Sequence, residues 1–294
     1  MRWQPDWGLR VRMFVTMFLL FVLFIVFAGA ITWYLGGGAL MMGLLFCGFS
    51  LAQWYFSDRI TLWSMGGSAV SEDEAPELHA MIERLSQQAD LPKPTVAIAD
   101  NRVPNAFATG RSQSHAVVCV TSGILGVLED DELEGVLAHE LSHIKNHDMV
   151  VMTVASMLGT LAFIVVRWGW LFGGGRSRGN NGGGSVLIAI AVSFVVWIVS
   201  FLLIRALSRY REYAADRGSA AITGKPAALA SALLKISGRI DKVPEQDLRD
   251  HAQMNAFFII PLRAGVLGQL FATHPSTEKR VERLRALERE LETV

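Results

Sequence analysis

Four long apolar stretches constrain this chain more than any other feature of its sequence. They occupy residues 13–35, 37–56, 149–172 and 185–204, and the third includes one charged residue, Arg167, towards its end. About 20 apolar residues cross the hydrocarbon core of a bilayer, so each stretch is long enough for a transmembrane helix. Aromatic residues near their ends, such as Trp33 and Trp54, favour the membrane–water interface. We therefore expect a mainly α membrane protein with four transmembrane helices.

The first apolar stretch has an alternative interpretation as a signal peptide. Arg2, Arg10 and Arg12 precede it, and residues 28–30 (Ala-Gly-Ala) resemble a cleavage site. However, the apolar sequence continues directly into the second stretch, with no polar start of a mature protein between them. An uncleaved helical hairpin is the better prediction.

The distribution of basic residues predicts the orientation in the membrane. Three arginines precede the first span and none lies between the first two, which favours a cytoplasmic N-terminus. Arginines also follow the fourth span, whereas Arg176 and Arg178 at the tip of the second hairpin count against this topology. Residues 1–56 would then form the first membrane hairpin and residues 149–204 the second. Residues 57–148 and 205–294 would together form one cytoplasmic domain.

The composition agrees with a mixture of membrane-embedded and soluble parts. Hydrophobic residues make up 51% of the chain and the mean hydropathy is +0.34, yet 18% of the residues are charged and need contact with water. The 27 basic residues equal the 27 acidic ones, so no basic excess suggests a nucleic-acid partner. Cys47 and Cys119 are too few and too far apart for a cysteine-rich zinc module or a disulfide framework.

The segments outside the spans predict helices and a small amount of β-structure. Residues 95–99 and 115–121 are expected strands of a small edge hairpin, joined by a polar turn region that contains Asn105 and Gly110. Residues 256–272 are apolar but interrupted by proline and arginine, which favours soluble core. The expected helices lie at 71–91, 206–222, 226–237 and 277–292.

Residues 139–143 read His-Glu-Leu-Ser-His and carry the strongest chemical signal. Positions i and i+4 share one face of a helix, so His139 and His143 can reach the same metal ion. Glu140 is rotated by about 100° and can accept a proton from water at the metal. Four acidic residues at 129–132 favour a helix start, and the absence of Pro or Gly between His143 and Met149 predicts that this helix continues into the third span. A helix with two surface histidines is the alternative, because so short a motif also arises by chance.

A catalytic zinc ion requires a third protein ligand. His147 lies one turn further along, but three ligands on one straight helix cannot easily surround an ion. Glu212 is the better candidate, and Asp216, on the same helical face, can orient a ligand histidine. An ordinary solvated acid, paired with Arg209 or Arg211, is the alternative for Glu212.

The His-Glu-Leu-Ser-His motif occurs together with three other segments: Glu-Tyr-Ala-Ala-Asp at 212–216, Thr-His-Pro at 273–275 and residues 105–110. This combination resembles the HtpX family of membrane zinc metalloproteases. That family is related to the CAAX prenyl endopeptidases, and the resemblance covers nearly the whole chain. It implies a zincin-like cytoplasmic metalloprotease domain with one zinc ion. It also implies polypeptide substrates, above all misfolded or damaged membrane proteins, and a role in quality control and stress response at the bacterial cell inner membrane.

The resemblance also implies roles for individual residues. Zinc would be bound by His139, His143 and Glu212, with Glu140 as the general base. Asp216 would support the site, while His274 would stabilise the oxyanion with Arg280 nearby, although a packing role for His274 is the alternative. Asn105 would lie on an edge strand that pairs with the substrate. The roles of His147 and Asp148 stay open.

Two other classes of function are less well supported. A scaffold with a structural zinc site would need no base such as Glu140, and it would fill the fourth coordination position with protein. A transporter would need charged residues deep in its spans, and none lies there. The sequence therefore favours a zinc-dependent endopeptidase.

Overall fold

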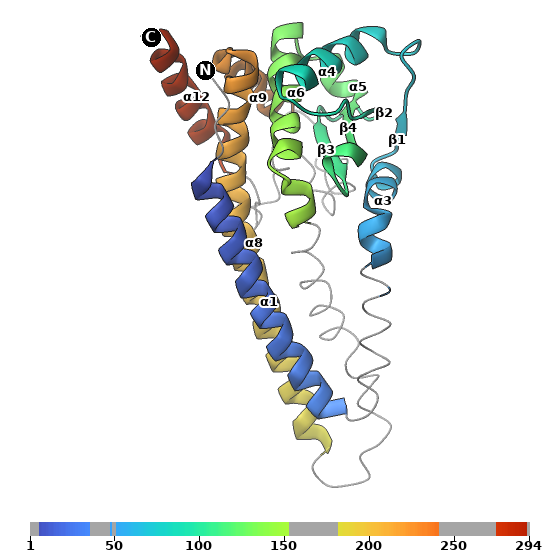
Figure 1. Cartoon of the computed structure of the whole chain (residues 1–294), viewed down its shortest axis with the longest axis vertical. Helices are drawn as coiled ribbons and strands as arrows, with labels where there is room; N and C mark the ends of the chain where they lie inside the picture. Colours follow the sequence, from blue (N-terminus) through green and yellow to red (C-terminus); the bar gives the residue numbers. More distant parts are fainter. Residues whose placement is uncertain (1–5, 36–47, 49–50, 153–181, 241–274, 293–294) are drawn as a thin grey trace. The chain divides into compact units, whose positions relative to one another are not determined.

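The structure is a computed structural model that describes residues 6–35, 48, 51–152, 182–240 and 275–292 (Figure 1). Most of the expected spans 37–56 and 149–172, and all of the expected core segment 256–272, lie outside these residues. Contacts divide the chain into two compact units. The first comprises Met1–Asp6, Phe56–Val150 and Ser208–Val294, and the second comprises Trp7–Tyr55 and Val151–Leu207.

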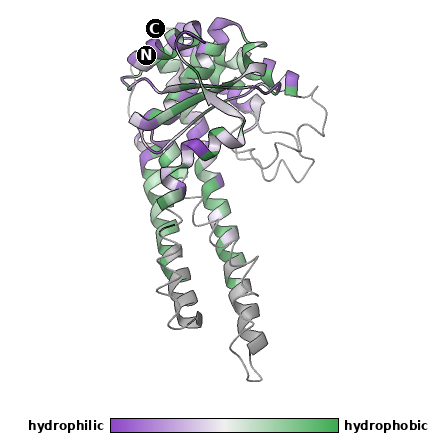
Figure 2. Ribbon diagram, turned by 90° about the vertical axis from the view of Figure 1, so that its right-hand side faces the viewer, coloured by the Kyte–Doolittle hydropathy of each residue, from purple (hydrophilic) through white to green (hydrophobic). Residues whose placement is uncertain are grey.

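Two long helices, α1 and α8, account for most of the described part of the second unit. Helix α1 (Trp7–Leu35) covers the apolar stretch 13–35, and α8 (Gly182–Thr223) begins in this unit and continues into the first. Leu20 is buried and packs against Leu203 and Ile204. Figure 2 shows that the coloured lengths of these helices are largely hydrophobic. Across the described residues, no helix is both long and apolar enough to cross a membrane.

The first unit contains a four-stranded mixed sheet in the order β1-β2-β4-β3. Strands β2 and β4 are parallel, whereas β1 pairs with β2 and β3 pairs with β4 in antiparallel fashion. Every residue of β4 is buried, so this strand forms the centre of the sheet. The strand bounds are Gly67–Ala69 for β1, Thr95–Ala99 for β2, Ala106–Gly110 for β3 and Ala116–Thr121 for β4.

The sheet contains a hairpin, but it is not the one expected between residues 95–99 and 115–121. Residues 95–99 and 116–121 pair in parallel, and the partner of β4 in the hairpin is β3, a segment expected to be a turn. Gly110, at the end of β3, adopts a φ of +139°, and an added Cβ would lie 2.2 Å from the His115 carbonyl oxygen. Asn105 and Gly110, which suggested a turn, therefore lie at the two ends of the short strand β3.

Helices pack around this sheet in the first unit (Figure 1). Their apolar faces join the buried strands in one core, which includes Ile82, Leu137, Leu233 and Leu284. The helix expected at 71–91 begins at Pro76, because proline suits a first turn, whereas the helix expected at 277–292 has those bounds. The remaining bounds are α3 Ser57–Ser64, α4 Pro76–Gln88, η2 Gln113–His115, α5 Ser122–Leu125, α6 Asp130–Lys145, α9 Pro226–Ile240 and α12 Thr277–Glu292.

Candidate metal centre

Helix α6 supplies two histidines of the centre, and its sequence fixes where it starts. Glu129 and Glu132 form a capping box, in which each side chain accepts a hydrogen bond from the other residue's backbone N–H. Every residue from Glu132 to Ile144 is buried, so the helix runs through the core. His139 and His143, one turn apart, are only 1% and 8% exposed.

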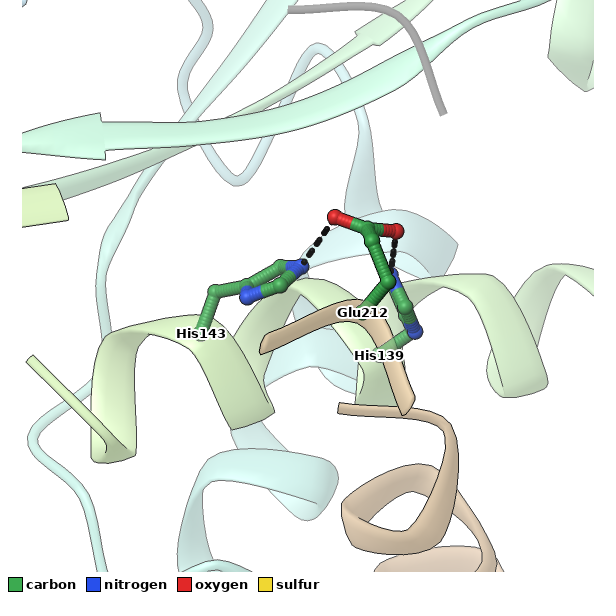
Figure 3. Close-up of side chains that lie close together, drawn as sticks. All are labelled: His139, His143 and Glu212. Carbon is green, nitrogen blue, oxygen red and sulfur yellow. Dashed lines mark ion pairs between the residues drawn. The ribbon is translucent and has the colours of Figure 1, made fainter. Parts of the chain in front are cut away.

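The two imidazoles converge on Glu212, which comes from the last part of α8 (Figure 3). His139 Nε2 lies 3.5 Å from Glu212 Oε2, and His143 Nε2 lies 3.5 Å from Glu212 Oε1. The rings are nearly perpendicular, at 86°, with centroids 4.8 Å apart. One ligand atom from each residue lies within 4.8 Å of the others. Two imidazole nitrogens and a carboxylate oxygen form a donor set that zinc prefers.

The charges around these residues also fit a divalent cation. Among the residues that the structure describes, four buried carboxylates lie next to the histidines or next to the residues that contact them, and two buried guanidinium groups accompany them. These residues are Glu140, Asp148, Glu212 and Asp216 on the acidic side, and Arg211 and Arg280 on the basic side. With neutral histidines and ionised carboxylates, two negative charges remain in a site of low dielectric, where unbalanced charge is costly. A divalent metal would balance them.

Behind His139 lies a buried ion pair between α8 and α12. His139 Nδ1 is 3.0 Å from Asp216 Oδ1, and Arg280 donates to both Asp216 oxygens at 2.6 and 3.0 Å. Arg280 Nη1 also lies 3.3 Å from Glu212 Oε2. Burial alone would raise the pKa of Asp216, but the charge of Arg280 and the hydrogen bond with His139 lower it. Asp216 therefore stays an anion that can orient the imidazole.

Glu140 occupies the space between α6 and strand β3. Its side chain is 5% exposed, and the backbone N–H of Ala108 donates to its Oε2 at 2.9 Å. Burial raises the pKa of Glu140 above its usual value. A buried carboxyl group with a raised pKa, held next to the metal ligands, is suited to accept and return a proton.

Helix α6 does not continue into the following segment, which corrects the expectation from the sequence. It ends at Lys145, His147 adopts the left-handed conformation with φ 60°, and residues 148–152 are again helical. Gln113 Nε2 donates to the carbonyl oxygens of Ile144 and Lys145 at this break. His147 is exposed and lies outside the metal-ligand group, whereas Asp148 is fully buried against His143.

The structure thus brings together six of the expected site residues, namely His139, Glu140, His143, Glu212, Asp216 and Arg280. Asn105 lies immediately before β3 and is fully buried, and its backbone N–H and C=O both bond to Thr121. His274 lies outside the described residues.

Comparisons with known proteins place these features in a family. Residues 72–288 match peptidase family M48. A protein named Protease HtpX homolog 2 from Methanosarcina mazei is 54% identical over 293 residues, which cover 99% of each chain. A Protease HtpX homolog from Moorella thermoacetica is 52% identical over 300 residues, covering 98% of this chain and 97% of its own.

A solved structure shares the fold. The crystal structure of S. mikatae Ste24p matches with a TM-score of 0.54 at 18% sequence identity, and the match covers 93% of this chain and 67% of that one. At this identity the likeness concerns the fold alone.

Proposed function

We infer the function of this chain from the family to which it belongs: it is a member of peptidase family M48, and a metalloendopeptidase of the HtpX type. We propose that its metal is one zinc ion, held by His139, His143 and Glu212. The observation that supports this most directly is the convergence of three buried ligand atoms within 4.8 Å. The balance of buried charge around them also favours a divalent ion.

The proposed mechanism is hydrolysis of a peptide bond by water. His139, His143 and Glu212 would hold the zinc ion, which would supply the Lewis acidity needed to lower the pKa of water at this position. Glu140 removes the proton from the attacking water and passes it to the leaving amine. The hydrogen bond from Ala108 N–H to Oε2 fixes the orientation of the Glu140 carboxyl group. Asp216 and Arg280 hold His139, and His274 is proposed to stabilise the oxyanion.

We propose that an extended substrate segment lies along β3. This strand is at the end of the sheet order and pairs only with β4 within the described sheet. Ala108 in the middle of β3 contacts Glu140 through its backbone, so a peptide along this strand would pass close to the base. Backbone pairing binds extended peptides with little demand on their sequence. Asn105 would mark the start of this binding strand.

We further propose a membrane location. The chain would cross the cell inner membrane four times, with residues 57–148 and 205–294 as the cytoplasmic protease domain. Support comes from the four apolar stretches and from the many large hydrophobic side chains that α1 and α8 leave exposed, such as Phe14 at 72% and Val195 at 58%. Misfolded or damaged membrane proteins are the proposed substrates, which would give the enzyme a role in quality control under stress.

Cleavage of an unfolded protein such as casein tests the proposed chemistry. The enzyme is purified in detergent, stripped with a chelator and then given zinc. We expect cleavage to require zinc, and the Glu140→Gln variant to lose about 10²- to 10⁴-fold in kcat, the usual contribution of general acid–base catalysis. Asp131→Asn is the matched control, because this exposed carboxylate at the start of α6 pairs with Lys225 and lies at the opposite end of α6 from His143.

Two results would decide against the proposal. If Glu140→Gln cleaved casein at the same rate as the parent enzyme, Glu140 could not be the general base. Stoichiometric zinc binding without cleavage of casein or any membrane-protein substrate would instead favour a scaffold with a structural zinc site.

A further inference from the structure

We propose that Asp148 is a positioning residue for the metal ligand His143, and that Arg211 and the left-handed turn at His147 hold it in place. The inference rests on the proposed metal site and extends it to a residue whose role the sequence leaves open. Asp148 touches neither substrate nor metal in this assignment. It acts through the imidazole of His143.

The contacts of Asp148 are those of a carboxylate that orients an imidazole. Its side chain is 0% exposed, and Oδ2 lies 2.6 Å from His143 Nδ1. A proton donated from Nδ1 to this carboxylate leaves the lone pair on Nε2, which is the nitrogen that faces Glu212 at 3.5 Å. Carboxylates in this position fix the tautomer and the ring orientation of metal-binding histidines.

The backbone makes an unusual turn to bring Asp148 there. In a continuous helix, a residue five positions after His143 would be rotated by about 140° and would face away from it. The left-handed His147, with φ 60°, ends α6 and returns the chain toward His143. Glycine is the usual residue at such a helix end, since a side chain is strained there. Retained strain beside a candidate active site points to a functional requirement.

Asp148 also keeps an unsatisfied atom. Its Oδ1 is buried and has no hydrogen-bond partner within the part of the chain that the structure describes. Arg211 Nε lies 3.1 Å from Oδ2 and supplies the balancing charge. A buried carboxylate with only part of its bonding capacity used is poorly explained by stability, and a role in holding His143 explains why it is present.

The two ligand histidines are supported in the same way. His139 faces Asp216, which is ion-paired with Arg280, and His143 faces Asp148, which is ion-paired with Arg211. Arg211 directly precedes the ligand Glu212 in α8. Its ion pair with Asp148 therefore also ties the segment that carries the third ligand to the segment that follows α6.

Zinc affinity and the cobalt spectrum test this assignment. Zinc Kd is measured by competition with a chelator, and the absorption spectrum of the Co²⁺-loaded protein reports ligand geometry. We expect Asp148→Ala to weaken zinc binding by about 10- to 100-fold, the usual effect of removing such a partner, and to change the Co²⁺ bands. Asp148→Asn keeps an acceptor oxygen but loses the charge, so its zinc Kd should lie between those of Asp148→Ala and the parent protein. At saturating zinc, kcat should fall while KM stays constant.

Controls separate positioning from general stability. Asp131→Asn removes an exposed carboxylate far along α6 and should leave Kd and spectrum unchanged. If Asp148→Ala does not fold, the nearly isosteric Asp148→Asn carries the same measurements. Unchanged zinc Kd and Co²⁺ spectrum in these variants, with only a lower Tm, would overturn the inference. Absence of metal binding by the parent protein would instead refute the proposed function itself.

Discussion

At the scale of single residues, the centre is a set of buried charges that must be balanced by either protons or metal. Burial disfavours protonation of both histidines, yet hydrogen bonds to carboxylates raise the pKa of His139, with Asp216 and Glu212 as partners. In the same way, Asp148 and Glu212 raise the pKa of His143 to about 10. In the metal-free protein, these carboxylates therefore favour protonated imidazoles, whose positive charge a divalent ion would otherwise provide.

Zinc binding should consequently release protons. The pKa of His143, about 10, means that its ring carries a proton at pH 7 that must leave before Nε2 can bind metal, and the raised pKa of His139 acts in the same direction. We expect a release of at least about one proton per zinc at pH 7, and weaker zinc binding as the pH falls. Calorimetric titrations in buffers of different ionisation enthalpy measure this number. A release near zero would show that the histidines are neutral without metal.

The convergence of His139 and His143 could be predicted from the sequence, because positions i and i+4 share one face of any helix. The place of Glu212 beside them could be inferred because a zinc site would need a third ligand. Asp148 could not be assigned, because its contact with His143 depends on one left-handed residue, and His147 is not a residue type that signals such a turn. The orientation of a side chain after a helix break is a tertiary property.

At the scale of elements, long periodic helices were predicted better than short strands. The charged helix α12 has a clear apolar face and its expected bounds are confirmed. Strand β3 was missed because its five residues, Ala-Phe-Ala-Thr-Gly, contain little β-branched sequence and end in a glycine. Its pairing with the buried β4 overrides the weak local preference.

The close approach of α6 and α9 depends on Gly135. An added Cβ there would lie 3.0 Å from the backbone N and 3.1 Å from the Cα of Leu229, so a helix would have to move. Gly135→Ala should therefore lower stability by about 1–3 kcal/mol through overpacking, despite the better helix propensity of alanine.

Gly238 provides the matched control for this prediction. It lies in α9 with nothing within 4 Å of an added Cβ, so Gly238→Ala should raise stability by about 0.5–1 kcal/mol. Thermal and denaturant unfolding of both variants measures the difference. An increase in stability for Gly135→Ala would show that the two helices have room to separate.

At the scale of the whole molecule, the candidate site is assembled from segments that lie far apart in the chain. His139 and His143 precede Val151–Leu207, which belongs to the other unit, and Glu212 follows it. The metal centre therefore requires the chain to leave the protease unit and return to it. Under the proposed topology, the segment between the ligands is the second membrane hairpin, which keeps both halves of the site on one side of the membrane.

Under the proposed topology, this connectivity limits how far the site can lie from the bilayer. Residue 149, where the third span is expected to start, is six positions after His143, and six extended residues reach at most about 20 Å. Glu212 is eight positions after residue 204, the expected end of the fourth span. A membrane-tethered substrate should therefore be cut best when its unfolded segment lies near its own span. Substrates with the same segment moved outward along a flexible linker measure this dependence, with Glu140→Gln as the inactive control. Equal cutting at every distance would place the site away from the membrane surface and refute the proposed topology.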